Sequence, residues 1–152
     1  MKTKSWFSIL IIVCSLILTA CQTNTPAPIQ NEPQEAARDI PTPAAGKAIL
    51  SGRAIHADGS PYADTPMRLA QIFREGDQGA FVIDTANSPA AMSGTDGFFT
   101  FVDVPPAEYL IVIGWLEDNN YVIHQNKAGE PYTYQLEADE TRDLGELKIE
   151  GP

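Results

Sequence analysis

Large apolar residues occupy every second position in two consecutive stretches of the chain, and this pattern constrains the fold more than any other. The first stretch contains Phe99 and Phe101, and the second contains Tyr109, Ile111 and Ile113. Successive side chains of a β-strand point to opposite faces, so the alternation predicts two strands of one half-buried sheet. We therefore expect these five residues to share one hydrophobic core.

Turn signals divide the remaining chain into further short strands. Thr95-Asp96-Gly97 precedes the first central stretch, Pro105-Pro106 separates the two stretches, and Asp58-Gly59 marks an earlier turn. Other strands are expected at Ala48–Ala57, Pro66–Phe73, Ala80–Thr85, Tyr121–His124, Tyr132–Leu136 and Leu144–Ile149. About seven or eight short strands, without a useful helical period, predict an all-β sandwich.

The first residues of the chain have the layout of an export signal. Lys2 and Lys4 precede the apolar run Trp6–Leu18, and small residues then lead to Cys21. The order Leu-Thr-Ala-Cys at positions 18–21 resembles a bacterial lipobox. This resemblance implies a signal peptide over residues 1–20 and lipid attachment at Cys21, with a diacylglyceryl group and a further palmitate-type acyl chain.

The predicted lipid places the protein in the bacterial cell envelope, on the extracytoplasmic side of a membrane. Two or three acyl chains hold a protein firmly in a bilayer, whereas one chain holds it only marginally. The alternatives are an ordinary signal peptide with a chance cysteine and an uncleaved membrane anchor. The other cysteine is Cys14, inside the predicted signal, so the mature chain is expected to contain no disulfide.

Residues 21–45 are poor in large apolar side chains and rich in proline. Ile29 and Ile40 are the only large aliphatic residues there. Such a segment cannot bury enough apolar surface to offset the entropy lost on ordering. We expect it to be a disordered tether between Cys21 and one folded domain over residues 46–152.

The folded part carries a pattern in two halves. The first half comprises Gly52, Ala54, Gly59, Pro61, Tyr62, Thr65, Met67 and Leu69, and the second comprises Thr95-Asp96, Phe98-Phe99, Phe101, Val104-Pro105-Pro106, Tyr109, Ile111 and Ile113. This pattern resembles the carboxypeptidase regulatory-like domain, which is related to Cna B-type repeats. The resemblance implies a seven-stranded, Ig-like or prealbumin-like β-sandwich. Ala107 departs from it, because the family usually has glycine there.

The charge of the chain argues against one class of partner. The net charge is −10, and loss of residues 1–20 would remove Lys2, Lys4 and no acid, which gives −12. Affinity for nucleic acid depends mainly on lysine and arginine contacts with phosphates. We therefore expect no nucleic-acid partner. The expected partners are the membrane, through acylated Cys21, and an envelope protein or glycan.

Catalytic, cofactor and metal sites are not expected. The chain has two histidines, His56 and His124, and no thiol outside Cys14 and Cys21. The oxygen-bearing side chains of residues 117–120 (Glu-Asp-Asn-Asn) lack the spacing of a calcium-binding loop and are better explained as a turn. The sequence therefore favours a non-enzymatic binding or scaffolding module.

Aromatic residues raise one alternative function, a carbohydrate-binding accessory module of the cell envelope. Their parity places Trp115 on the face of Ile113, and Tyr132 and Tyr134 on the face of Leu136, which predicts core positions. Exposed contacts are expected instead from two other aromatic side chains, Phe98 and Tyr121.

Overall fold

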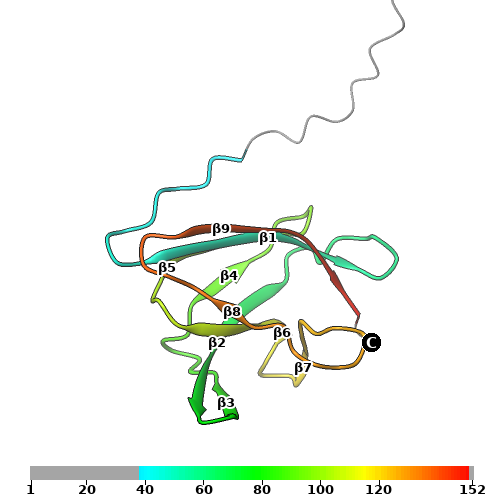
Figure 1. The fold of residues 1–152 in the computed structure, drawn as a ribbon. Coiled ribbons are helices and arrows are strands. Elements are labelled where there is room, and N and C mark those ends of the chain that lie inside the picture. Colours follow the sequence, from blue (N-terminus) through cyan, green and yellow to red (C-terminus); the bar gives the residue numbers. More distant parts are fainter. Residues whose placement is uncertain (1–37, 151–152) are drawn as a thin grey trace, which may run out of the picture. The chain divides into compact units, whose positions relative to one another are not determined.

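A computed structural model describes residues 38–150, which form an all-β domain without a helix (Figure 1). The predicted signal peptide, Cys21 and the tether up to residue 37 lie outside the described residues. Nine strands are present: β1 (Ala48–His56), β2 (Pro66–Glu75), β3 (Gln78–Val82), β4 (Ala90–Met92), β5 (Phe98–Val104), β6 (Glu108–Trp115), β7 (Asn120–Ile123), β8 (Tyr134–Gln135) and β9 (Thr141–Ile149). The all-β class is confirmed.

The strand count exceeds the expected seven because two short strands join the larger sheet. Strand β4 has three residues and β8 has two. A longer strand is expected at Tyr132–Leu136, but only its two middle-to-late residues, Tyr134 and Gln135, form a strand, which is β8. Within residues 38–150 no apolar helix of membrane-spanning length occurs.

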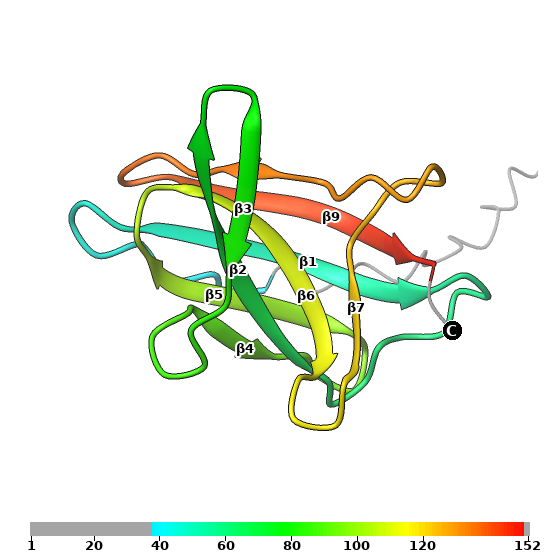
Figure 2. The same cartoon turned by 90° about the horizontal axis from the view of Figure 1, so that it is seen from below.

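The strands form two sheets, drawn as two layers in Figure 1. One sheet has the order β5-β1-β9, in which β1 is antiparallel to β5 and parallel to β9. The other has the order β3-β2-β6-β7, with β4 paired to β2 and β8 paired to β6. The end of the β2–β3 hairpin extends beyond the other strands (Figure 2), and every residue of β3 is exposed.

Strands β5 and β6 lie in different sheets, so the prediction that they belong to one sheet is wrong. The chain changes sheets at the Pro105-Pro106 corner, where proline lacks the amide proton that a continuing ladder requires. The hydroxyl of Tyr109 donates a hydrogen bond of 2.9 Å to the carbonyl oxygen of Pro105. This bond ties the start of β6 to the corner.

One hydrophobic core contains buried residues from both sheets. It confirms the prediction that the five alternating residues share one core. All five alternating residues of β5 and β6 belong to it, with members of β1, β2 and β9. In β5 the alternation is interrupted by a bulge at Asp103, whose φ is 53°, so that both Phe101 and Val104 are buried. Val102, on the opposite face, is half exposed as expected.

Candidate functional site

Two surface pockets collect the side chains that are best suited to ligand binding. The aromatic pocket is lined by His56, Tyr62, Thr65, Ile113, Gly114, Trp115, Asn120, Tyr121 and Val122. The histidine pocket is lined by His124–Lys127, Tyr132, Tyr134, Leu144, Glu146–Lys148 and Glu150. Their volumes are about 260 Å³ and about 380 Å³, and they share no lining residue.

The first wall of the aromatic pocket is the loop that follows β1. The carboxylate of Asp58 accepts hydrogen bonds from the amide and hydroxyl of Ser60, at 2.9 and 2.6 Å. The amide of Tyr62 then donates to the carbonyl of Ala54, which returns the chain to β1. As a result the Tyr62 ring stacks on His56, with ring centroids 3.7 Å apart and planes inclined by 19°.

The opposite wall is the β6–β7 hairpin, in which the backbone of β7 approaches Gly114 of β6 closely. This glycine has φ +116°, and a Cβ there would lie 2.4 Å from the carbonyl oxygen of Asn120. The close approach pairs Trp115 with Asn120 across the hairpin. The pocket therefore combines an indole with an amide that can donate and accept hydrogen bonds.

Trp115 is 48 % exposed, so its predicted core position is wrong, although Ile113 two residues earlier is 1 % exposed. Parity places both on one face of β6, but Trp115 is the last residue of the strand, and nothing buries its ring there. Tyr121, named as an exposed contact, is 38 % exposed and lines the same pocket.

Phe98 was the other expected contact, and its ring is covered on one face. The guanidinium of Arg38 lies 4.2 Å from the centroid of this ring and pairs with the carboxylate of Asp96. Phe98 is only partly exposed. Arg38, expected to belong to the tether, therefore contacts the domain.

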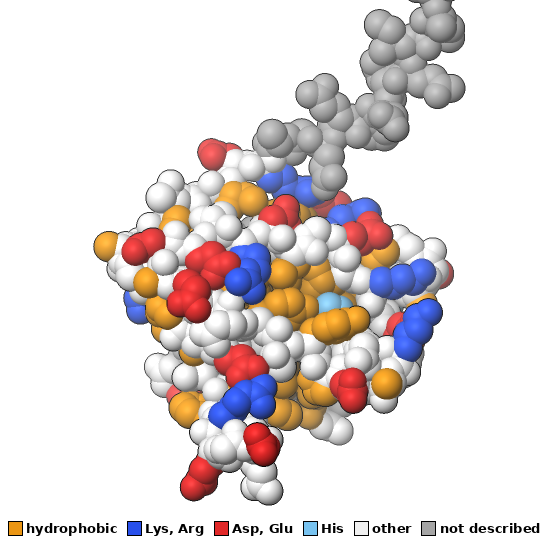
Figure 3. All heavy atoms as spheres, viewed as in Figure 1, with side chains coloured by type: hydrophobic (Ala, Val, Ile, Leu, Met, Phe, Trp, Pro, Cys, Tyr) orange, Lys and Arg blue, Asp and Glu red, His pale blue; other side chains and the backbone are white. Residues whose placement is uncertain are grey.

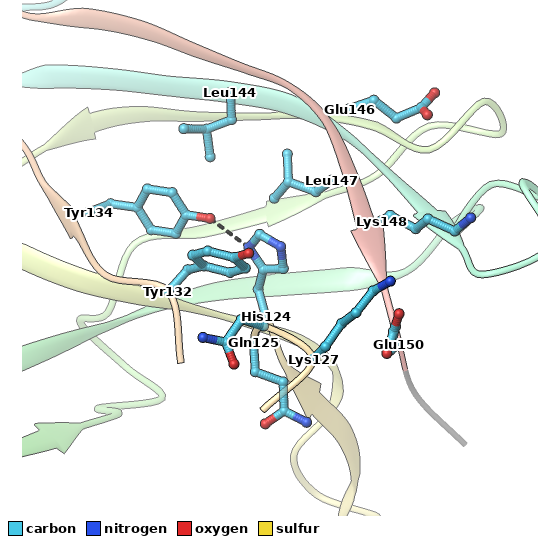
Figure 4. A pocket seen from close by; sticks show the side chains of 11 residues that line it. His124, Gln125, Lys127, Tyr132, Tyr134, Leu144, Glu146, Leu147, Lys148 and Glu150 are labelled. Carbon is cyan, nitrogen blue, oxygen red and sulfur yellow. Dashed lines mark hydrogen bonds between the residues drawn. The ribbon is translucent and has the colours of Figure 1, made fainter. Parts of the chain in front are cut away.

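The histidine pocket is built where the chain leaves β7 and returns towards β8 (Figure 4). The amide of His124 donates to Ile111, and its carbonyl accepts from Tyr132, both at 3.0 Å. The imidazole Nδ1 lies 2.5 Å from the hydroxyl of Tyr134, and the Tyr132 ring centroid lies 4.6 Å from that of the imidazole. Leu147 on β9 closes the pocket opposite them.

Burial controls the protonation of this pocket. His124 is 8 % exposed, and burial lowers its pKa from the ordinary 6.5. Burial also raises the pKa of Tyr134, to which the neighbouring Tyr132 contributes. Both side chains are thus neutral at pH 7, and Tyr134 occupies one of the two imidazole nitrogens.

The predicted core position is correct for Tyr134 and wrong for Tyr132. Tyr134 is partly buried against the core and confirms its prediction, as does Leu136, which is fully buried. Tyr132 is 46 % exposed and contradicts it. Sequence reasoning missed this pocket, because only the pairing of β9 with β1 brings Leu147 and Lys148 opposite the loop after β7.

Figure 3 shows the chemical character of one face of the domain. A histidine side chain lies among hydrophobic side chains, with basic side chains nearby and acidic ones spread around them.

Within residues 38–150 no group of three or more His, Cys, Asp or Glu side chains could hold a metal ion. Neither pocket contains a cysteine or a serine.

No protein-family model and no curated protein matches the chain. Several solved structures are similar to it in fold. A Pseudomonas aeruginosa protein described as a candidate carbohydrate-binding protein is 16 % identical with a TM-score of 0.42, and the match covers 74 % of this chain and 99 % of that one.

Two further structures match over part of their length. An (S)-allantoin synthase is 12 % identical with a TM-score of 0.39, over 73 % of this chain and 43 % of the other. A 9R-lipoxygenase from Cyanothece is 13 % identical with a TM-score of 0.36, over 68 % and 16 %. These proteins have unlike activities, and similarity at this level assigns none of them to the present chain.

Proposed function

We propose that the chain is a lipid-anchored, non-enzymatic module of the bacterial cell envelope that binds carbohydrate in the aromatic pocket. The observation that carries the proposal is the half-exposed indole of Trp115 beside the stacked rings of His56 and Tyr62. An aromatic face left open in this way offers a flat apolar surface to the C–H face of a sugar ring. Asn120 also lines the pocket, and its amide can bond sugar hydroxyls.

The pocket is suited to one sugar unit, since its volume of about 260 Å³ lies just below the usual range of ligand-binding sites. One of its rings is held before the ligand arrives, because Tyr62 stacks on His56. The β6–β7 pairing fixes the backbone of Trp115 opposite Asn120. Pre-organised aromatic groups lose little entropy on binding, which favours affinity in a shallow site.

The anchoring part of the proposal is supported by the order Leu-Thr-Ala-Cys at residues 18–21 and by the proline-rich segment after it. The finer fold assignment, a carboxypeptidase regulatory-like domain, is supported by the bond from Tyr109 to Pro105. A tyrosine hydroxyl that bonds the backbone a few residues upstream is typical of Greek-key sandwiches. Ala107 has no positive φ in this corner, which explains why glycine is not required there.

Glycan binding is tested with an array of envelope polysaccharides, using the full-length chain and the variant Trp115→Ala. We expect binding by the wild type and loss of binding by the variant. Phe73→Ala is the matched control, because Phe73 is also a half-exposed aromatic residue but lies on the β2–β3 hairpin. Glycan binding that is absent, or that is equal in all three proteins, contradicts the proposed site.

Anchoring is tested separately by membrane fractionation of the wild type and of Cys21→Ala, with the intact mass of the mature N-terminus. We expect the wild type in the membrane fraction with acyl mass on Cys21, and the variant outside it. A variant that still sediments with membranes contradicts the lipid anchor. This result leaves the glycan test unaffected.

An envelope protein is the second candidate partner, favoured by the exposed β2–β3 hairpin. Its side chains Phe73, Phe81 and Val82 are each about half exposed. Phe73 and Val82 share one face of the hairpin, because Val82 pairs with Gln71, whereas Phe81 pairs with Ile72 on the other face. Exposed apolar residues that share a face often mark a protein contact. A photo-crosslinking residue at position 82 is expected to join the chain to a partner in intact cells, and a lack of crosslinks contradicts this candidate.

A further inference from the structure

The histidine pocket holds an unusual share of the unpaired basic groups. Four arginines of the described domain, Arg38, Arg53, Arg74 and Arg142, form ion pairs, and the fifth, Arg68, donates to the carbonyl of Thr85. No ion pair within residues 38–150 includes a lysine. Of the three lysines there, Lys127 and Lys148 both line this pocket.

The acidic residues at the same rim offset only part of this charge. Glu146 is already bound by Arg53, at 3.1 Å. Glu150 lines the pocket as well, but no ion pair joins it to Lys127 or Lys148. The groups without an ion-pair partner therefore sum to a positive charge, in a chain whose net charge is −10. A local positive site on an acidic protein attracts anions selectively.

The floor of the pocket supplies one hydrogen-bonding group and two ring faces. Because Nδ1 of His124 is engaged by the Tyr134 hydroxyl, only Nε2 is left for a ligand. Figure 4 shows His124 between Tyr132 and Leu147, with Lys127 and Lys148 on the side away from Tyr134. The volume of about 380 Å³ falls within the range of small-molecule sites.

We infer that the histidine pocket binds a small ligand with a carboxylate on a six-membered ring. The carboxylate lies near the ammonium groups of Lys127 and Lys148, and the ring lies against Tyr132, within reach of Nε2 of His124. Two sources share this chemistry, a sugar acid and an aromatic acid. The site is separate from the aromatic pocket, so the inference does not depend on glycan binding there.

The test is a calorimetric titration at low salt with two acids, glucuronate and benzoate, on the full-length Trp115→Ala variant, so that sugar bound in the aromatic pocket does not contribute. Each acid has a neutral counterpart of similar shape, glucose and benzyl alcohol. We expect at least one acid to bind and its neutral counterpart not to bind. Glucuronate alone identifies a sugar-acid site, benzoate alone identifies an aromatic-acid site, and either result supports the inference.

Single charge removals locate the site. Lys127→Gln and Lys148→Gln are each expected to weaken binding about fivefold, the size of one solvent-exposed ion pair, and added salt weakens it further. Lys47→Gln removes the same charge at the remaining lysine, which lines neither pocket, and leaves affinity unchanged. All three lysine changes are made in the Trp115→Ala background.

Three results would overturn the inference. They are binding of neither acid by the folded chain, equal binding of an acid and its neutral counterpart, and equal affinity of Lys127→Gln, Lys148→Gln and Lys47→Gln. Because both pocket lysines are exposed, their variants are expected to fold. The amide spectrum of each variant checks this.

Discussion

The core and the two pockets both contain aromatic side chains, yet they differ in what covers these rings. Between the sheets, Phe99, Phe101 and Ile113 are each at most 1 % exposed. In the pockets, Trp115 and Tyr132 are about half exposed. An aromatic residue in the core stabilises the fold through buried area, whereas one in a pocket leaves that area for a ligand.

This difference shows that the strand face on which a side chain lies does not by itself determine how far that side chain is buried. Ile113 and Trp115 have the same parity on β6, but only Ile113 lies within the core shared by the two sheets. We therefore expect substitutions in the core to change the free energy of unfolding, and substitutions in the pockets to change binding.

Gly97→Ala is expected to destabilise the fold more than the other glycine substitutions, by about 3 to 4 kcal/mol. Gly97 has φ +83°, and its Cβ would lie 2.4 Å from the carbonyl oxygen of Ala54. The measurement is urea unfolding of the full-length chain.

Gly129→Ala is the control for this substitution. Gly129 also has φ +83°, but no atom lies within 4 Å of the position of its Cβ. It therefore reports the backbone strain alone, about 1 kcal/mol. Equal losses in the two variants would show that the approach to Ala54 does not matter.

Gly52→Ala is expected to cost about 1 to 3 kcal/mol, because it overpacks the core. The added Cβ would lie 2.9 Å from Cδ1 of Leu147 and 3.1 Å from Cζ of Phe99. Gly79→Ala is the control in the exposed strand β3, where the nearest group is the flexible end of Arg74. A chemical-denaturation midpoint that falls equally for both glycines would contradict tight packing around Gly52.

The sequence predicts the core residues of β5 and β6 because alternation is a local property. Each of these side chains is directed by its own backbone, so a period of two identifies them without the partner strand. The turn at Gly97 is also visible, since its positive φ needs glycine. The resulting all-β class agrees with the structure.

The sequence does not predict how those strands are distributed between the sheets. The change of sheet at Pro105-Pro106 and the bulge at Asp103 depend on contacts with residues far along the chain. The candidate sites are hard to predict from the sequence for the same reason. Tyr121 was identifiable, but the exposure of Trp115 and the meeting of His124 with Lys148 depend on where each strand ends.

Tyr134→Phe is expected to cost about 1 kcal/mol, less than the core changes. It leaves Nδ1 of His124 without its 2.5 Å partner in a largely buried position. Tyr132→Phe is the control, because the Tyr132 hydroxyl forms none of the hydrogen bonds seen within residues 38–150. Thermal unfolding that shifts equally in both variants would argue against a stabilising role for the bond.

The same histidine is expected to give a pH-dependent stability. Since burial lowers the pKa of His124 below 6.5, the unfolded chain binds this proton more readily than the folded chain. The contribution is complete above about pH 6.5 and decreases as the pH falls, until the folded pKa is passed. We expect His124→Gln to reduce the slope of stability against pH in that window, and an unchanged slope would contradict the assignment.

Trp115→Ala is expected to change stability least, by at most about 1 kcal/mol, although it removes the largest side chain of all. The indole is half exposed, so its removal leaves no closed cavity. Ile113→Ala removes fewer atoms from the same face of β6 but opens a cavity in the core, which costs about 2 to 5 kcal/mol. Urea unfolding of both variants and the glycan array then separate the two roles: Ile113→Ala lowers stability, and Trp115→Ala lowers binding. If Trp115→Ala destabilised the domain as much as Ile113→Ala, its indole would belong to the core after all, and the aromatic pocket would lose its main binding surface.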